Sequence, residues 1–105
     1  MDNSEKTDAL RPDSDELEQL ADLHKAMGDY TRMKILWYLM EGEYCVNDLA
    51  KEMRITESAV SHQLRGLRMS RLVRANKVGK NVFYSLQDEH IKWILRQTYD
   101  HISEH

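Results

Sequence analysis

The sequence contains few of the residues that interrupt helices or cross-link a chain. Its 105 residues include one proline, four glycines and one cysteine, Cys45. So little proline and glycine favours helices over an all-β fold with many turns. A single cysteine excludes a framework of disulfide bonds within the chain. These shortages predict a mainly helical protein without intrachain disulfides.

Long apolar segments are also missing. No run approaches the roughly 20 apolar residues that a membrane-spanning helix needs, so we expect no membrane partner. Residues 1–15 are polar and acidic, and they lack the basic and apolar regions of a signal peptide. A cytoplasmic protein is the simplest expectation.

The length of the chain predicts one domain. A chain of 105 residues is long enough for one domain and too short for two. Residues 1–12 are charged and contain little apolar surface, so we expect them to form a disordered arm. Residues 13–105 are expected to form the folded domain. Because a short chain buries a smaller share of its surface than a long one, dimerisation would be a natural supplement.

The charges are unevenly distributed along the chain. The formal net charge of −3 argues, at first, against a nucleic-acid partner. Residues 54–81, however, hold seven basic residues and one acid, Glu57, so this segment carries +6 and the rest of the chain −9. One concentrated basic stretch can bind phosphate locally, although a solvated basic surface would have the same composition.

Apolar residues at helical spacing predict five helices. Asp13 and Glu16 have the spacing of a capping box at the start of the first helix, and Asp29 can cap the second. The apolar stripe of the second helix is Met33, Leu36, Trp37 and Met40. The predicted helices run from 13 or 14 to 28, from 29 to 42, from 46 to 53, from 56 or 57 to about 70, and from about 89 to 103.

Two strands are predicted between the last two helices. Residues 72–75 and 82–86 are rich in apolar residues, with valines and aromatic residues among them, and the loop between them, residues 76–81, contains Gly79. The element order is therefore ααααββα. Short helices followed by a basic hairpin are typical of a winged helix-turn-helix, so the predicted fold class is mainly α with a β-hairpin wing.

The fourth predicted helix has the composition of a DNA-reading helix. Val60, Leu64 and Leu67 share its apolar face. The opposite face offers donors for phosphates and base edges, and Arg68 and Arg71 follow as residues suited to backbone phosphates. An ordinary amphipathic surface helix is the alternative. The predicted DNA-binding residues are Ser58, Ser61, His62 and Arg65 on this helix and Lys77, Lys80 and Asn81 on the hairpin loop.

The last helix carries four residues that can bind a metal ion: Asp88, His90, His101 and Glu104. His90 and His101 fall on nearly the same helix face but roughly 16 Å apart. Because zinc–nitrogen bonds are about 2 Å long, the two histidines cannot share an ion within one helix. They can share one across an antiparallel pair of helices, which gives two equivalent sites in a homodimer.

The donor set indicates the metal and its role. Two imidazoles and two carboxylates form a closed four-coordinate site that suits Zn²⁺, with Co²⁺ as a substitute. A closed site disfavours hydrolytic chemistry, which needs an open position, and no organic small-molecule substrate is expected. The alternatives are structural, since Asp88 can serve only as an N-cap and His101 and Glu104 can be surface residues.

The sequence resembles the ArsR/SmtB family of metal-sensing repressors from about Leu17 to Glu104. Residues 25–32 (KAMGDYTR) resemble the family's entry to the second helix. Residues 45–50 (CVNDLA) are similar to its third helix, residues 57–64 (ESAVSHQL) to its recognition helix, and residues 79–86 to its wing. The resemblance implies a dimeric repressor that binds double-stranded operator DNA without metal and releases it when zinc binds.

The last helix resembles the zinc-sensor branch of that family. There an Asp, a His two residues on, a His eleven further and a His or Glu three later hold the metal, and Asp88, His90, His101 and Glu104 match these positions. The resemblance also implies that the second ring nitrogen of His101 bonds toward the DNA-binding core near Arg71.

The family's second, thiolate-rich site is incomplete here. Cys45 and Asp48 match its helix part, but no Cys or His precedes His24, which we interpret as structural. Cys45 is then expected to be a small buried residue, and a cadmium, lead or arsenic sensor is disfavoured. The alternatives are a repressor that responds to Ni²⁺, Co²⁺ or Cys45 chemistry, a protein-binding adaptor and, least favoured, a metalloenzyme.

Overall fold

A computed structural model describes residues 10–104 of the chain. Most of the predicted arm, residues 1–9, and His105 lie outside the described residues. The elements are α2 (Ser14–Gly28), α3 (Tyr30–Glu41), α4 (Val46–Met53), α5 (Glu57–Met69), β1 (Val73–Val78), β2 (Asn81–Leu86) and α6 (Glu89–Ser103). This order confirms the predicted ααααββα winged helix-turn-helix. No helix in the described part is long and apolar enough to cross a membrane.

Local hydrogen bonds set where the helices begin. Asp13 forms the predicted capping box, because its Oδ1 accepts a bond from the Glu16 amide at 2.9 Å and Glu16 Oε1 accepts one from the Asp13 amide. Asp29 and Thr56 cap α3 and α5 in the same way, through the amides of the residues three positions on. The helix boundaries therefore follow the predicted ones within about a residue.

The hairpin differs from the prediction. β1 and β2 pair antiparallel from Val73↔Leu86 to Val78↔Asn81, so only Gly79 and Lys80 form the turn. The predicted loop over residues 76–81 was wrong, since most of it is strand. The outer half of the ribbon is exposed, including its apolar residues Val78 and Val82, and it is held by backbone pairing rather than by apolar burial. An apolar pattern therefore cannot reveal it.

The core lies where α3, α4, α5, the base of the hairpin and α6 meet. Leu49, Val60 and Leu95 are fully buried there. On α3 the fully buried positions are Ile35, Leu36 and Leu39, whereas the predicted Met33, Trp37 and Met40 are half-buried. This helix contacts α2, α5 and β2, so its buried arc is wider than a single stripe.

An extra bridge ties the wing to the loop before α4. The Tyr44 amide donates to the Tyr84 carbonyl at 3.1 Å, and the Tyr84 amide donates to the Tyr44 carbonyl at 2.8 Å. The Tyr44 hydroxyl donates to Glu41 Oε1 at 3.0 Å. This hydrogen bond is the largest cause that raises the pKa of Tyr44, and desolvation by burial is the second. The base of the wing is thus held from both sides.

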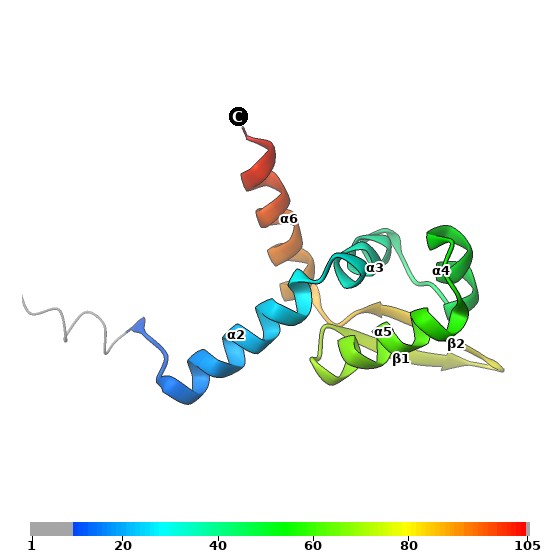
Figure 1. The fold of residues 1–105 in the computed structure, drawn as a ribbon, viewed down its shortest axis with the longest axis horizontal. Coiled ribbons are helices and arrows are strands. Elements are labelled where there is room, and N and C mark those ends of the chain that lie inside the picture. Colours follow the sequence, from blue (N-terminus) through cyan, green and yellow to red (C-terminus); the bar gives the residue numbers. More distant parts are fainter. Residues whose placement is uncertain (1–9, 105) are drawn as a thin grey trace, which may run out of the picture.

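Two helices project from the compact part of the molecule. Figure 1 shows α2 (blue to cyan) and α6 (orange to red) extending away from the α3–α5 and hairpin body. Apolar side chains are exposed on both: Leu17 and Leu20 on α2, and Trp93 and Ile102 on α6, where Trp93 is 65% and Ile102 67% exposed. Apolar surface of this kind on projecting helices marks an interaction surface.

Candidate nucleic-acid interface and metal centre

The predicted DNA-reading helix, α5, presents its polar face to solvent. Val60, Leu64 and Leu67 are buried against the core, which fixes the roll of the helix. The four predicted DNA-binding residues of this helix lie away from that apolar face. Ser58, His62 and Arg65 are exposed, and Ser61 is half-buried.

The one acid of the basic segment is held at the start of α5. Glu57 Oε2 accepts a hydrogen bond from Asn47 Nδ2 at 3.1 Å, which joins α4 to α5. The carboxylate is thereby occupied by its neighbour in the helix-turn-helix. Beyond Glu57, the exposed side chains of α5 include the hydrogen-bond donors Ser58, His62 and Arg65 and no carboxylate.

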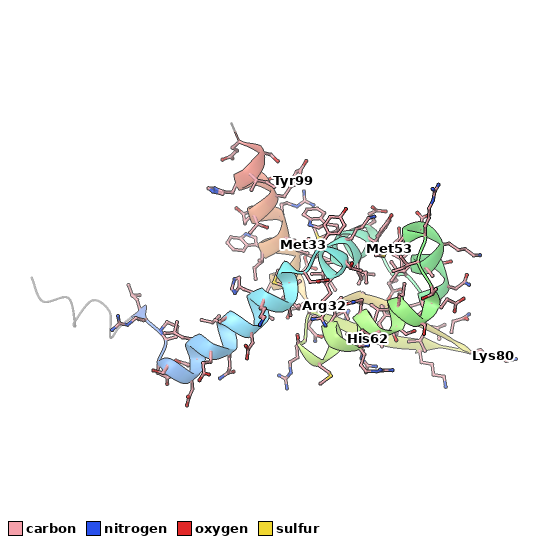
Figure 2. All side chains as sticks on the ribbon, in the orientation of Figure 1. Arg32, Met33, Met53, His62, Lys80 and Tyr99 are labelled. Carbon is pink, nitrogen blue, oxygen red and sulfur yellow. The ribbon has the colours of Figure 1, made fainter. Side chains whose placement is uncertain are left out.

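Two of the three DNA-binding residues predicted on the hairpin loop lie on its strands instead. Lys77 lies on β1 and Asn81 on β2, whereas Lys80 lies in the turn, at the tip of the hairpin (Figure 2). All three are exposed. Because the ribbon extends past the core, these residues are carried outward on the side of the molecule that also holds α5 (Figure 1).

A contact that the sequence analysis missed fixes α5 against α3. Arg32 Nε donates to Gln63 Oε1 at 2.9 Å, and the guanidinium lies against Gly66, where a Cβ would come within 2.9 Å of Arg32 Cζ. Figure 2 shows Arg32 between the two helices. A glycine inside a helix costs about 1 kcal/mol relative to alanine. The presence of Gly66 in the middle of α5 was therefore the one signal in the sequence that another group packs closely there.

Two of the predicted metal ligands lie together at the start of α6. His90 Nδ1 is 3.5 Å from Asp88 Oδ1, and the side chains are 90% and 47% exposed. Asp88 also caps α6, because Oδ1 accepts a bond from the Ile91 amide at 3.2 Å. Its Oδ2 accepts none of the hydrogen bonds found in residues 10–104, which leaves one carboxylate oxygen for a ligand.

The other two predicted ligands lie at the opposite end of α6. His101 is in the last turn and Glu104 follows as the C-cap, and both are exposed. Within residues 10–104 of one chain, no three His, Cys, Asp or Glu side chains gather as a metal site. The four predicted ligands form two pairs roughly 16 Å apart along one helix, and only a second chain can bring the pairs together.

The donor chemistry fits a zinc ion. Each pair combines one imidazole with one carboxylate, and two pairs supply the four donors of a closed tetrahedral site. An open apolar hollow of about 530 Å³ adjoins His90 and is lined by Glu89, Trp93 and Ile94. A partner chain that covered this hollow would exclude water beside His90.

Cys45 and His24 take structural positions. Cys45 is a half-buried N-cap residue of α4 that makes no capping hydrogen bond. His24 is exposed on α2, and its Nδ1 lies 2.8 Å from the carbonyl oxygen of Leu20 in the same helix. No second thiol exists in the chain, so a thiolate-rich site cannot form around Cys45 within one chain.

The sequence is similar to those of known proteins. Residues 29–75 match the family model described as bacterial regulatory protein, arsR family. The chain is 46% identical over 90 residues to a transcriptional repressor SmtB homolog of Synechocystis, covering 86% of this chain and 68% of that protein. It is 40% identical to the cadmium resistance regulatory protein CadC homolog of Staphylococcus aureus, covering 81% and 71%. It is also 40% identical to the transcriptional regulator NmtR of Mycobacterium tuberculosis, covering 89% and 77%.

Solved structures share the fold. The solution structure of apo-NmtR has a TM-score of 0.78 at 36% identity, covering 90% of this chain and 83% of that one. A homodimeric winged helix-turn-helix DNA-binding domain from Mycobacterium bovis has a TM-score of 0.80 at 26% identity, covering 100% and 92%. The molecule is a DNA-binding transcriptional regulator and not an enzyme. The chain belongs to the arsR family of bacterial regulatory proteins.

Proposed function

We propose that the chain is a zinc-responsive transcriptional repressor whose metal-free homodimer binds operator DNA and whose zinc-bound form releases it. One observation carries the proposal. Two exposed ligand pairs, Asp88 with His90 and His101 with Glu104, occupy the two ends of one projecting helix. An antiparallel partner helix completes two equivalent four-ligand sites per dimer.

The exposed apolar residues of α2 and α6 support the homodimer. One chain exposes Leu17 and Leu20 on α2 and Trp93 on α6. The opposite side of α6 buries Ile91 and Leu95 in the core. A helix that is apolar on two sides is suited to pack against its own core and against a partner. The same contact would bury the apolar surface beside His90.

The connection from Asp88 to the DNA-reading elements is short. Asp88 follows β2 by two residues, and the Gln87 amide between them donates to the Leu72 carbonyl at 3.0 Å. Leu72 is buried just after α5. When bound, zinc supplies a bridge between the two α6 helices, and a displacement of Asp88 would pass through Gln87 and Leu72 to the wing and α5.

Zinc is favoured by the donor atoms. Nitrogen and carboxylate oxygen suit Zn²⁺ and Co²⁺, whereas cadmium, named for the Staphylococcus relative, prefers several thiolates, and this chain has a single cysteine. Ni²⁺ accepts the same donors but prefers a square-planar or tetragonal arrangement of them. A tetrahedral four-ligand site therefore favours zinc, with cobalt as a substitute.

The test is a zinc titration of the metal-free protein bound to its own promoter DNA, followed by fluorescence anisotropy at fixed salt. We expect release near one zinc per chain and loss of the response in His90→Ala. A Cys45→Ser variant should respond like the wild type. Tight binding that is indifferent to zinc would overturn the metal response, and absence of DNA binding would overturn the repressor.

A further inference from the structure

An open hollow of about 510 Å³ lies between α5 and the wing. Ser61, Arg65, Arg68 and Met69 line it from α5, and Tyr84 lines it from β2. None of these residues is acidic. The hollow therefore joins the DNA-reading helix to the wing through a surface made of hydroxyl and guanidinium groups.

The two arginines of the hollow are not paired with other side chains. Neither Arg65 nor Arg68 takes part in a salt bridge or side-chain hydrogen bond found among residues 10–104. Arg32 and Arg74, in contrast, donate to Gln63 and to Ser85, respectively. Unpaired guanidiniums beside one hollow favour an anionic ligand, because a guanidinium offers several donors in a fixed plane.

Tyr84 is held in place more firmly than a surface tyrosine. Its backbone pairs with Ala75 in the hairpin and with Tyr44 in the extra bridge, at 2.8 and 3.1 Å. The side chain is half-buried, and its hydroxyl makes no hydrogen bond among the described residues. A fixed, unused hydroxyl at the edge of a basic hollow is a preorganised donor.

We infer that this hollow binds a phosphodiester of the DNA backbone at the border of the major groove that α5 enters. Arg68 and Arg65 supply the charge, and Ser61 and Tyr84 supply neutral hydroxyl donors. Such contacts fix the register of a protein on a duplex without reading its sequence. The inference rests on the proposed DNA-binding function and adds Tyr84 to the interface.

Salt dependence tests the charged half of the site. Binding to a duplex of random sequence is measured by anisotropy over a salt series, for the wild type, Arg68→Gln and the control Arg96→Gln. The control removes the same charge from an exposed position on α6. The plot of log K against log salt has a negative slope. Loss of one phosphate contact per chain reduces the magnitude of that slope by about 0.9, hence by about 1.8 per dimer. We expect this change in Arg68→Gln and none in Arg96→Gln.

Tyr84→Phe tests the neutral half, because it keeps the ring and removes only the hydroxyl. The dimer loses two hydroxyl donors, so we expect affinity for the duplex to fall about fivefold to a hundredfold. The slope should not change, since no charge is lost. Circular dichroism and urea unfolding should match the wild type. An unchanged affinity in Tyr84→Phe, or equal slopes in Arg68→Gln and Arg96→Gln, would overturn the site.

Stabilisation by inorganic phosphate shows whether the hollow binds the DNA backbone or a free anion. If phosphate stabilised the wild type but not Arg68→Gln, while both bound the duplex with the same slope, the hollow would hold a free anion and the backbone assignment would be wrong. If the wild type did not bind the duplex even at about 50 mM salt, the proposed function would fail as well. If the wild type bound the duplex and Arg68→Gln kept the wild-type slope, only the phosphate site would be wrong, and the proposed function would stand.

Discussion

At Gly66 the lack of a side chain leaves room for the guanidinium of Arg32. The guanidinium of Arg32 occupies the space where a Cβ would be, and Arg32 Nε holds Gln63 from α3. The contact joins residues more than thirty positions apart. Sequence patterns find short-range periodicities, so they locate α5 and its faces but not the side chain that sets its position.

We expect Gly66→Ala to leave stability near that of the wild type. Alanine gains about 1 kcal/mol of helix propensity, and displacement of Arg32 from Gln63 costs a similar amount. In an Arg32→Ala background the clash is gone, so Gly66→Ala should stabilise by about 1 kcal/mol. Urea unfolding of the four proteins measures this coupling, and an equal effect of Gly66→Ala in both backgrounds would contradict it.

Asp88 caps α6 and is also a proposed zinc ligand, and one substitution can separate these two roles. Asparagine is as good an N-cap as aspartate, so Asp88→Asn should keep the stability of the metal-free protein, whereas Asp88→Ala should lose about 1 kcal/mol. Zinc affinity, measured by competition with a chelator, should fall by roughly tenfold or more in Asp88→Asn. Asp13→Asn, the same change at the N-cap of α2, is the matched control. Wild-type zinc affinity in Asp88→Asn would remove Asp88 from the ligand set.

At the scale of elements, the helices could be predicted and the wing only in part. Asp13, Asp29 and Thr56 cap their helices through bonds to residues three positions away, so the boundaries are encoded locally. The outer wing has no core to face. Asn76 and Lys77 therefore look like loop residues in the sequence, although their backbones pair with Phe83 and Val82.

The two-residue turn makes the wing depend on one glycine. Gly79 has φ of +63°, a conformation that costs other residues about 1–2 kcal/mol. We expect Gly79→Ala to lower the free energy of unfolding by about that amount. DNA affinity should fall as well, because Lys77, Lys80 and Asn81 lose their fixed positions.

Gly28→Ala is the control for the wing variant. Gly28 ends α2, has no unusual φ, and has nothing within 4 Å of an added Cβ. Alanine at this helix end should raise the free energy of unfolding by at most about 1 kcal/mol, and the DNA affinity should stay near wild type. Urea unfolding and duplex anisotropy measure both variants. If Gly79→Ala behaved like Gly28→Ala, the turn would not have the positive φ that the wing requires.

At the scale of the whole molecule, one chain carries the four proposed metal ligands but does not bring them together within residues 10–104. The sequence identifies Asp88, His90, His101 and Glu104 by type and spacing, and their faces follow from helix geometry. What the sequence of one chain does not contain is the partner surface that would bring the pairs together. The exposed Leu17, Leu20 and Trp93 mark where we expect that surface.

Replacement of Leu20 by glutamate is the simplest way to test the dimer. Leu20 is 42% exposed in one chain, so a charge there is tolerated in a monomer but not in an apolar contact between chains. We expect Leu20→Glu to sediment as a monomer and to lose tight DNA binding. Val78→Thr, at an exposed apolar position on the wing, should remain dimeric. A Leu20→Glu variant that stayed dimeric would place the interface elsewhere.

Mixing two inactive variants shows whether each site draws ligands from two chains. In a His90→Ala homodimer and in a His101→Ala homodimer, every site lacks one imidazole. In the heterodimer, the His101→Ala chain still offers His90 and the His90→Ala chain still offers His101, so one site is complete and the other lacks both. An equal mixture, unfolded together and refolded, contains about half heterodimers and should recover about one quarter of the wild-type sites. Zinc binding by competition with a chelator counts them. If each ion were held by one chain, no mixture would recover a site, because no chain would carry both histidines.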